Sequence, residues 1–317
     1  MMLFQSWLAP QFERFVAIKR AGGSDYGTQK RLLTQFDHYL AEHAPESPLR
    51  RETLLDFLAS LERLSLRARD NVVDVVWQAL ALARRHGESI DTIPPRPPMA
   101  PAHYRVRPAR LVSHENIGAV LAEARCLQPA NHLRSATYAT LYGLLFASGI
   151  RIGEALSLDI GDLDFDAGQL TVRNGKFGKS RVLPLAESTA SALERYVVDD
   201  RRRVGRSATD PFFVSRKLRR LSYPIANTTL KLLWASANLA GPLPCLHDFR
   251  HSFAVLTLLR WYQQGCDLNA LLPVLSTYLG HLSVESTRVY LQANGLLLDE
   301  ANQRFAHKCA LLDEVLS

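Results

Sequence analysis

Cysteine is sparse in this chain, and the cysteines present are not clustered. Four cysteines are scattered over 317 residues without a CxxC pair, so neither a zinc ribbon nor a disulfide scaffold is indicated. We expect free thiols in a reducing compartment. The sequence also lacks a glycine-rich phosphate-binding loop and an acidic metal cluster, so we expect no metal, ATP or nucleotide cofactor.

Long apolar runs are missing as well. The most apolar stretch, residues 138–150, is too short to span a bilayer. The first fifteen residues have no basic start followed by an apolar run, so they do not resemble a signal peptide. The sequence therefore predicts a soluble, cytoplasmic protein with no membrane partner.

Positive charge is in excess. Lysine and arginine number 38 against 31 acidic residues, which gives a formal charge of +7 and a pI of about 9.4. Most of the cations are arginines, whose planar guanidinium pairs with phosphate in a two-pronged geometry. A basic surface favours a polyanion such as DNA, because each neutralised phosphate releases counterions.

The first 92 residues have the pattern of a helical bundle. Apolar residues recur at helical spacing in residues 3–20, 28–43, 51–64 and 67–86. A proline cluster at residues 94–101 follows, and prolines cannot continue a helix. We therefore expect a helical domain over residues 1–92 and an extended, basic linker over residues 93–108.

Residues 109–317 have a mixed pattern. Two short strands are predicted at residues 169–173 and 181–185, joined by a glycine-containing hairpin, and the remainder is predicted to be helical. An amphipathic tail helix is predicted at residues 297–316. The expected fold class is mainly α with a small antiparallel β-sheet, that is, an N-terminal helical bundle followed by an α+β domain.

Three short motifs contain the candidate chemistry. They are SGIRIGE at residues 148–154, LHDFRHS at residues 246–252 and STYLGHLSVESTRVY at residues 276–290. Each has an ordinary structural explanation: an Arg–Glu pair, a helix cap with exposed polar residues, and a turn with a surface histidine followed by a core tyrosine. The string HDFRH is also similar to a zinc-protease helix, although its acid is an aspartate and no third ligand follows.

In this order the motifs resemble the dispersed active site of the tyrosine recombinases, the phage-integrase family. Residues 109–293 look like the catalytic domain of that family, and residues 1–92 are similar to its core-DNA-binding domain in position and size. The chain also resembles recombinases of bacterial mobile elements, some of them encoded in trios. The resemblance implies six catalytic residues: Arg151, Lys176, His247, Arg250, His281 and Tyr290. Lys179 lies on the same hairpin as Lys176 and is the alternative lysine.

The resemblance further implies site-specific recombination of double-stranded DNA. Tyr290 would form a 3′-phosphotyrosyl bond, with two arginines on the phosphate, His247 as general base and a hairpin lysine as general acid. The expected state is a monomer or dimer in solution and a homotetramer on paired DNA sites, with accessory recombinases as possible partners and the bacterial nucleoid as location. The alternatives are a type IB topoisomerase, a non-catalytic DNA-binding accessory protein and, more distantly, a zinc hydrolase.

Overall fold

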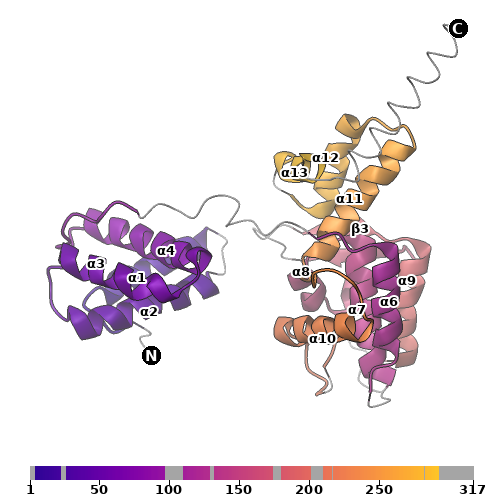
Figure 1. Cartoon of the computed structure of the whole chain (residues 1–317), viewed down its shortest axis with the longest axis horizontal. Coiled ribbons are helices and arrows are strands. Elements are labelled where there is room, and N and C mark those ends of the chain that lie inside the picture. Colours follow the sequence, from indigo (N-terminus) through magenta and orange to yellow (C-terminus); the bar gives the residue numbers. More distant parts are fainter. Residues whose placement is uncertain are drawn as a thin grey trace, which may run out of the picture. The chain divides into compact units, whose positions relative to one another are not determined.

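The chain divides into two compact units, an N-terminal unit of residues 1–108 and a C-terminal unit of residues 109–317 (Figure 1). The computed structural model describes residues 4–22, 26–96, 110–128, 132–173, 180–200, 210–215, 217–281 and 283–292. Each unit has its own hydrophobic core. Within the described residues, no helix has the length and apolar character needed to cross a bilayer.

The described part of the N-terminal unit contains four α-helices, as the periodicity predicts. They are α1 (Ala9–Ala21), α2 (Gly27–His43), α3 (Arg51–Ser60) and α4 (Leu66–Arg85), with a 3-10 turn η1 at Leu61–Arg63. Phe12, Phe36 and Phe57 meet in the core, where neighbouring rings lie 6.1 Å and 4.7 Å apart. The chain leaving α4 packs back on it, because Trp77 Nε1 donates to the Pro94 carbonyl at 2.8 Å.

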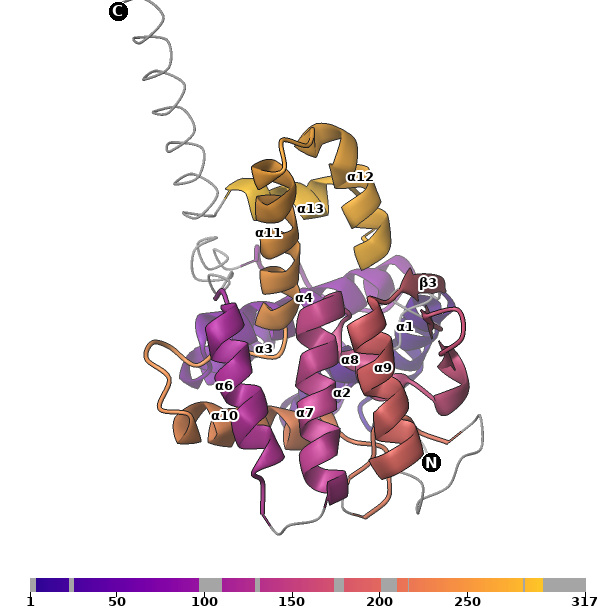
Figure 2. The ribbon, with the colours of Figure 1, turned by 90° about the vertical axis from the view of Figure 1, so that its right-hand side faces the viewer.

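The C-terminal unit combines helices with one small sheet. Its α-helices are α6 (His114–Arg125), α7 (His132–Ser148), α8 (Ile152–Ser157), α9 (Glu187–Arg195), α10 (Tyr223–Ser236), α11 (Asp248–Gln263), α12 (Leu268–Leu279) and α13 (Glu285–Gln292). A 3-10 turn η2 (Ile160–Asp162) and a π-helical turn η4 (Tyr196–Asp200) complete the described helical elements. In Figure 2, α6, α7 and α9 lie side by side, and α11, α12 and α13 group at one end of the unit.

The sheet is antiparallel, as predicted, but it has three strands rather than two. Strand β2 (Gln169–Val172) pairs with β3 (Arg181–Pro184), and the additional strand β1 (Leu163–Asp164) pairs with β2. In the register, Leu170 lies opposite both Leu163 and Leu183, and all three side chains are buried. A two-residue strand contains too few alternating positions to be recognised from its sequence.

Two hydrophobic clusters meet along α11. The larger cluster contains residues of α6 to α10 and of the sheet, and it includes Phe249. The smaller cluster joins α11, α12 and α13, and it includes Ala254 and Tyr290. Helix α11 therefore contributes to both clusters, and its first turn lies where they meet.

Several predicted features lie outside the described residues. These are Lys176 and Lys179, residues 97–108 of the expected linker and the predicted tail helix at residues 297–316.

Candidate active site

The first turn of α11 is fixed by contacts with the chain before α6. His247 occupies the N-cap position, and the Asp248 carboxylate accepts backbone N–H groups from Cys245 at 2.7 Å and Arg110 at 3.3 Å. One turn later, Ser252 Oγ accepts the Val112 N–H at 2.8 Å. Satisfying these buried polar groups fixes the register of α11, and with it the positions of its His and Arg side chains.

Arg250 is buried, with 1% of its surface exposed, which rules out for this residue the alternative explanation of a helix cap with exposed polar residues. Its guanidinium donates to the carbonyls of Gly149 at 3.0 Å and Leu279 at 2.7 Å. Burial, followed by the charge of Arg151, lowers the pKa of Arg250 to about 10, so the group is still a cation at neutral pH. Within the described residues, no carboxylate forms a salt bridge with it.

Arg151 lies at the N-cap of α8 and pairs with Glu154, as an i, i+3 pair predicts. Its Nη1 donates to Glu154 Oε1 at 2.8 Å, and its Nη2 donates to the Gly280 carbonyl at 3.0 Å. Glu154 also accepts two bonds from Arg181 of β3, at 3.0 Å and 2.8 Å. Burial alone would raise the pKa of Glu154, but its bonds to Arg181 and Arg151 lower the pKa overall.

A left-handed glycine ends α12 and positions His281. Gly280 has φ +69°, and the N–H of His281 returns to the Ser276 carbonyl at 3.0 Å, the bond that closes a helix C-terminus of this type. His281 Nδ1 lies 2.8 Å from the hydroxyl of Thr287, which is fully buried on α13. When Thr287 donates to Nδ1, the proton of the neutral ring is on Nε2, which is then free to donate.

Tyr290 belongs to the small hydrophobic cluster and is 7% exposed. Its ring lies 5.2 Å from that of His251, edge to face, and 6.1 Å from that of His281, nearly parallel. Burial raises the pKa of Tyr290, and this exceeds the lowering caused by the charge of Arg250, a hydrogen bond with it, and the charge of Arg151. The phenol is therefore neutral and lies beside a buried cation.

The histidines of the site are held neutral. Burial, assisted by the charges of His251, Arg250 and Arg151, lowers the pKa of His247 to about 4. Burial and the charge of Arg250 lower the pKa of His281 to about 4 as well. The His251 ring contacts that of His247 at 4.8 Å, and burial lowers its pKa too.

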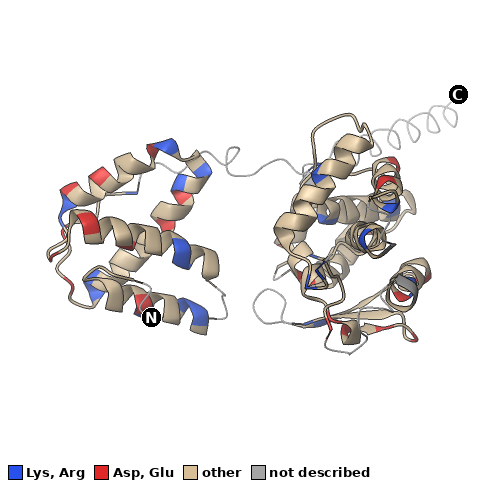
Figure 3. Ribbon diagram, turned by 90° about the horizontal axis from the view of Figure 1, so that it is seen from below, with Lys and Arg blue, Asp and Glu red and all other residues tan. Residues whose placement is uncertain are grey.

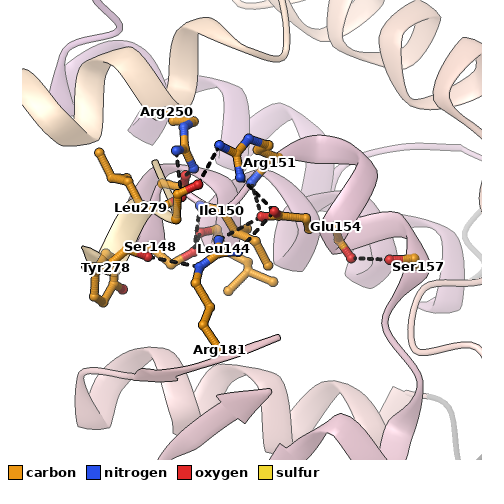
Figure 4. A network of polar contacts seen from close by, with 12 residues as sticks. Leu144, Ser148, Ile150, Arg151, Glu154, Ser157, Arg181, Arg250, Tyr278 and Leu279 are labelled. Atoms are coloured by element: carbon orange, nitrogen blue, oxygen red, sulfur yellow. Dashed lines mark hydrogen bonds and ion pairs between the residues drawn. The ribbon is translucent and has the colours of Figure 1, made fainter. Parts of the chain in front are cut away.

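Positive charge exceeds negative charge where these residues meet. Figure 4 shows Arg151, Arg181 and Arg250 around Glu154 and the end of α12. Three guanidinium groups lie around one carboxylate: Glu154 pairs with Arg151 and Arg181, while Arg250 forms no salt bridge within the described residues, so these four side chains have a net charge of +2 (three positive, one negative). A cluster of this kind is suited to an anion whose charge increases during a reaction.

Five of the six predicted site residues lie in this region: Arg151, His247, Arg250, His281 and Tyr290. The sixth, Lys176, lies outside the described residues. Sequence reasoning missed Arg181 and Thr287, and it considered His251 only as a zinc ligand. Within the described residues, no group of three or more His, Cys, Asp or Glu side chains is arranged to hold a metal ion.

Comparison with known proteins identifies the family. The family model described as the phage integrase family matches residues 113–295. The integrase/recombinase y4rE of Sinorhizobium fredii is 31% identical over 307 residues, which cover 96% of this chain and 97% of that protein. The integrase/recombinase y4rB of the same organism is 40% identical over 222 residues, which cover 67% of this chain and 71% of that protein. The chain belongs to the phage integrase family, the tyrosine recombinases.

Solved structures have the same fold. The XerH site-specific recombinase, bound to a palindromic difH substrate in a post-cleavage complex, has a TM-score of 0.65 at 20% identity and covers 88% of this chain and 79% of its own. The Tn1549 transposon integrase, in complex with transposon right end DNA, has a TM-score of 0.63 at 16% identity. The match covers 94% of this chain and 98% of the integrase chain. The predicted fold class is thereby confirmed.

Proposed function

We propose that this protein is a site-specific recombinase that cleaves and rejoins double-stranded DNA through a 3′-phosphotyrosyl intermediate on Tyr290. The observation that carries the proposal is the burial of a neutral tyrosine beside Arg250, in a cluster where three guanidinium groups face one carboxylate, a net charge of +2 among these described side chains. A phosphodiester brings one negative charge, and the pentacoordinate transition state brings two. The cluster therefore matches the charge of the transition state better than that of the ground state.

In the proposed step, Tyr290 Oη attacks the scissile phosphorus and the bond to the 5′ oxygen breaks. The phenol proton passes to His247, which is neutral and able to accept it. A bound phosphate places negative charge beside this histidine and raises its pKa toward neutrality, which strengthens it as a base. The 5′ oxygen takes its proton from Lys176, or from Lys179 of the same hairpin. A 5′ hydroxyl from another strand then reverses the step and joins the strands.

Arg151, Arg250 and His281 are the proposed ligands of the non-bridging oxygens. Each guanidinium uses donors on backbone carbonyls and retains others, since an arginine has five N–H donors. Removing one such donor from an oxyanion site costs roughly 10²–10³ in rate. The bond between His281 and Thr287 leaves Nε2 for the phosphate.

The N-terminal unit is the proposed core-DNA-binding domain. Figure 3 shows its lysines and arginines spread over several helices among acidic residues, so charge alone marks no single face as the DNA surface. The proposal relies on the position and size of the unit within the family. On DNA we propose a homotetramer across two paired sites, because strand exchange requires four tyrosines. Relatives named integrase/recombinase favour this over a topoisomerase that acts as a monomer.

A covalent-capture experiment tests the proposal. Wild-type protein incubated with a randomised library of nicked duplexes should give a protein–DNA complex that survives denaturant, because the nicked strand diffuses away and traps the intermediate. Tyr290→Phe removes only the nucleophilic oxygen and should give none. A complex of equal yield with Tyr290→Phe would refute the assignment.

A further inference from the structure

Arg181, the first residue of β3, is directed into the site and away from its own sheet. Its side chain is 14% exposed, and each nitrogen of its guanidinium group donates a hydrogen bond. Nη1 and Nη2 bind the two oxygens of Glu154 at 3.0 Å and 2.8 Å, and Nε binds the Tyr278 carbonyl at 3.0 Å. This two-pronged contact uses the planar geometry of arginine, which a lysine cannot reproduce.

Glu154 connects Arg181 to Arg151. Its carboxylate accepts the Nη1 group of Arg151 at 2.8 Å and the backbone N–H of Arg151 at 3.1 Å. A buried carboxylate with one arginine partner would neutralise that arginine. Since Arg181 shares the charge of Glu154, Arg151 keeps a net positive charge for another anion.

The same guanidinium packs against the turn that precedes His281. A Cβ atom built on Gly280 would lie 3.0 Å from both Cζ and Nη1 of Arg181, so the bare glycine backbone is what allows this approach. Arg151 holds the carbonyl of the same glycine at 3.0 Å. Together with Arg250, which binds the Leu279 carbonyl, these arginines hold three successive carbonyls at the end of α12.

We propose that Arg181 is a positioning residue for DNA cleavage. It compensates Glu154 so that Arg151 can give its charge to the scissile phosphate, and it holds the Tyr278 carbonyl and packs against Gly280 in the turn that leads into His281. This inference rests on the proposed function and assigns a role in that reaction to a residue outside the six proposed catalytic ones.

The test compares Arg181 with a second arginine that lies next to the same sheet. Arg181→Met removes the bonds to Glu154 and Tyr278, and Arg181→Lys keeps a charge without the two-pronged contact. The matched control is Arg173→Met, because Arg173 follows β2, pairs with Asp162 and is 62% exposed. The probe is a nicked duplex captured covalently by the wild type, with either an ordinary phosphate or an uncharged methylphosphonate at the scissile position.

We expect Arg181→Met to slow single-turnover cleavage of the phosphate duplex by about tenfold to a hundredfold, less than the loss of a direct donor. The loss should shrink to a few-fold on the methylphosphonate duplex, because less negative charge develops there. The cleavage rate of Arg181→Lys should lie between those of wild type and Arg181→Met. Arg173→Met should cleave both duplexes at the wild-type rate. Half-site DNA binding should be nearly unchanged in all three variants.

Three results would overturn the inference. Equal losses on the two duplexes would reduce Arg181 to a purely structural role. Cleavage by Arg181→Met at the wild-type rate would remove the role altogether, and if that variant does not fold, a wild-type rate for Arg181→Lys decides in the same way. If wild-type protein captures no duplex at all, the proposed function fails first and this inference fails with it.

Discussion

Replacing Gly149 by alanine tests how tightly the site backbone is packed. Gly149 has φ +60°, and a Cβ atom there would lie 2.5 Å from Cδ1 and 2.8 Å from Cγ of Phe253. The Phe253 ring stacks on Tyr278 at 5.5 Å, which restricts its movement. The left-handed backbone costs an alanine about 1–2 kcal/mol, and overpacking adds about 1–3 kcal/mol. We therefore expect Gly149→Ala to lower the free energy of unfolding by about 2–5 kcal/mol.

Gly168→Ala is the matched control. Gly168 has φ +61°, but its nearest neighbour for a Cβ atom is the Leu185 carbonyl at 3.8 Å, an ordinary contact. This variant should lose only the backbone cost of about 1–2 kcal/mol. The difference between the two variants isolates the clash with Phe253, and Phe253→Leu in the Gly149→Ala background should recover part of it.

The assay is urea denaturation monitored by hydrogen exchange of peptides from α7 and α11. These peptides report the unfolding of the C-terminal unit separately from that of the N-terminal bundle. Gly149 also presents its carbonyl to Arg250, so cleavage should fall further than stability alone explains. Equal destabilisation by Gly149→Ala and Gly168→Ala would refute the packing argument. Gly149→Ala with normal cleavage would refute the link from Gly149 to Arg250.

Three further predictions concern the chemical step. Arg151→Ala or Arg250→Ala should slow cleavage by roughly 10²–10³ while the salt slope of DNA binding falls by only about one; parallel losses of binding and cleavage would assign these arginines to general affinity. A bridging 5′-phosphorothiolate, whose leaving group needs no proton, should rescue Lys176→Ala but not Arg250→Ala, and rescue of Lys179→Ala instead would move the general acid along the hairpin. Protonated His247 cannot accept the phenol proton, and its pKa is lowered to about 4. The cleavage rate, measured at subsaturating protein, should therefore fall only as the pH drops toward that value. An acid limb near the ordinary histidine pKa of about 6.5 would contradict this assignment.

Much of the fold follows from periodicity. The helices of the N-terminal unit and α11 repeat apolar residues at helical spacing, and the sequence between β2 and β3 contains glycines that predict a turn, so all of these elements can be predicted. Strand β1 is too short for this, and its pairing with β2 depends on how the chain folds back after η2. The predicted fold class was right, and the number of strands was wrong.

The site was predictable only where spacing encodes it. Arg151, His247, Arg250, His281 and Tyr290 occur in short motifs whose order resembles a known family. Arg181 gives no such signal, because its partners lie 27 and 97 residues away in sequence. Contacts of this kind are created by tertiary packing at the junction of two hydrophobic clusters, and no local pattern encodes them.

The most direct test of the central claim is to locate the covalent bond. Captured wild-type complex is digested with nuclease and protease, and the remaining peptide–nucleotide conjugate is sequenced by tandem mass spectrometry. We predict a nucleotide joined through its 3′ phosphate to the phenolic oxygen of Tyr290, in a peptide from α13. A nucleotide on any other residue, or a bond through a 5′ phosphate, would contradict the assignment of Tyr290 as the nucleophile of a tyrosine recombinase.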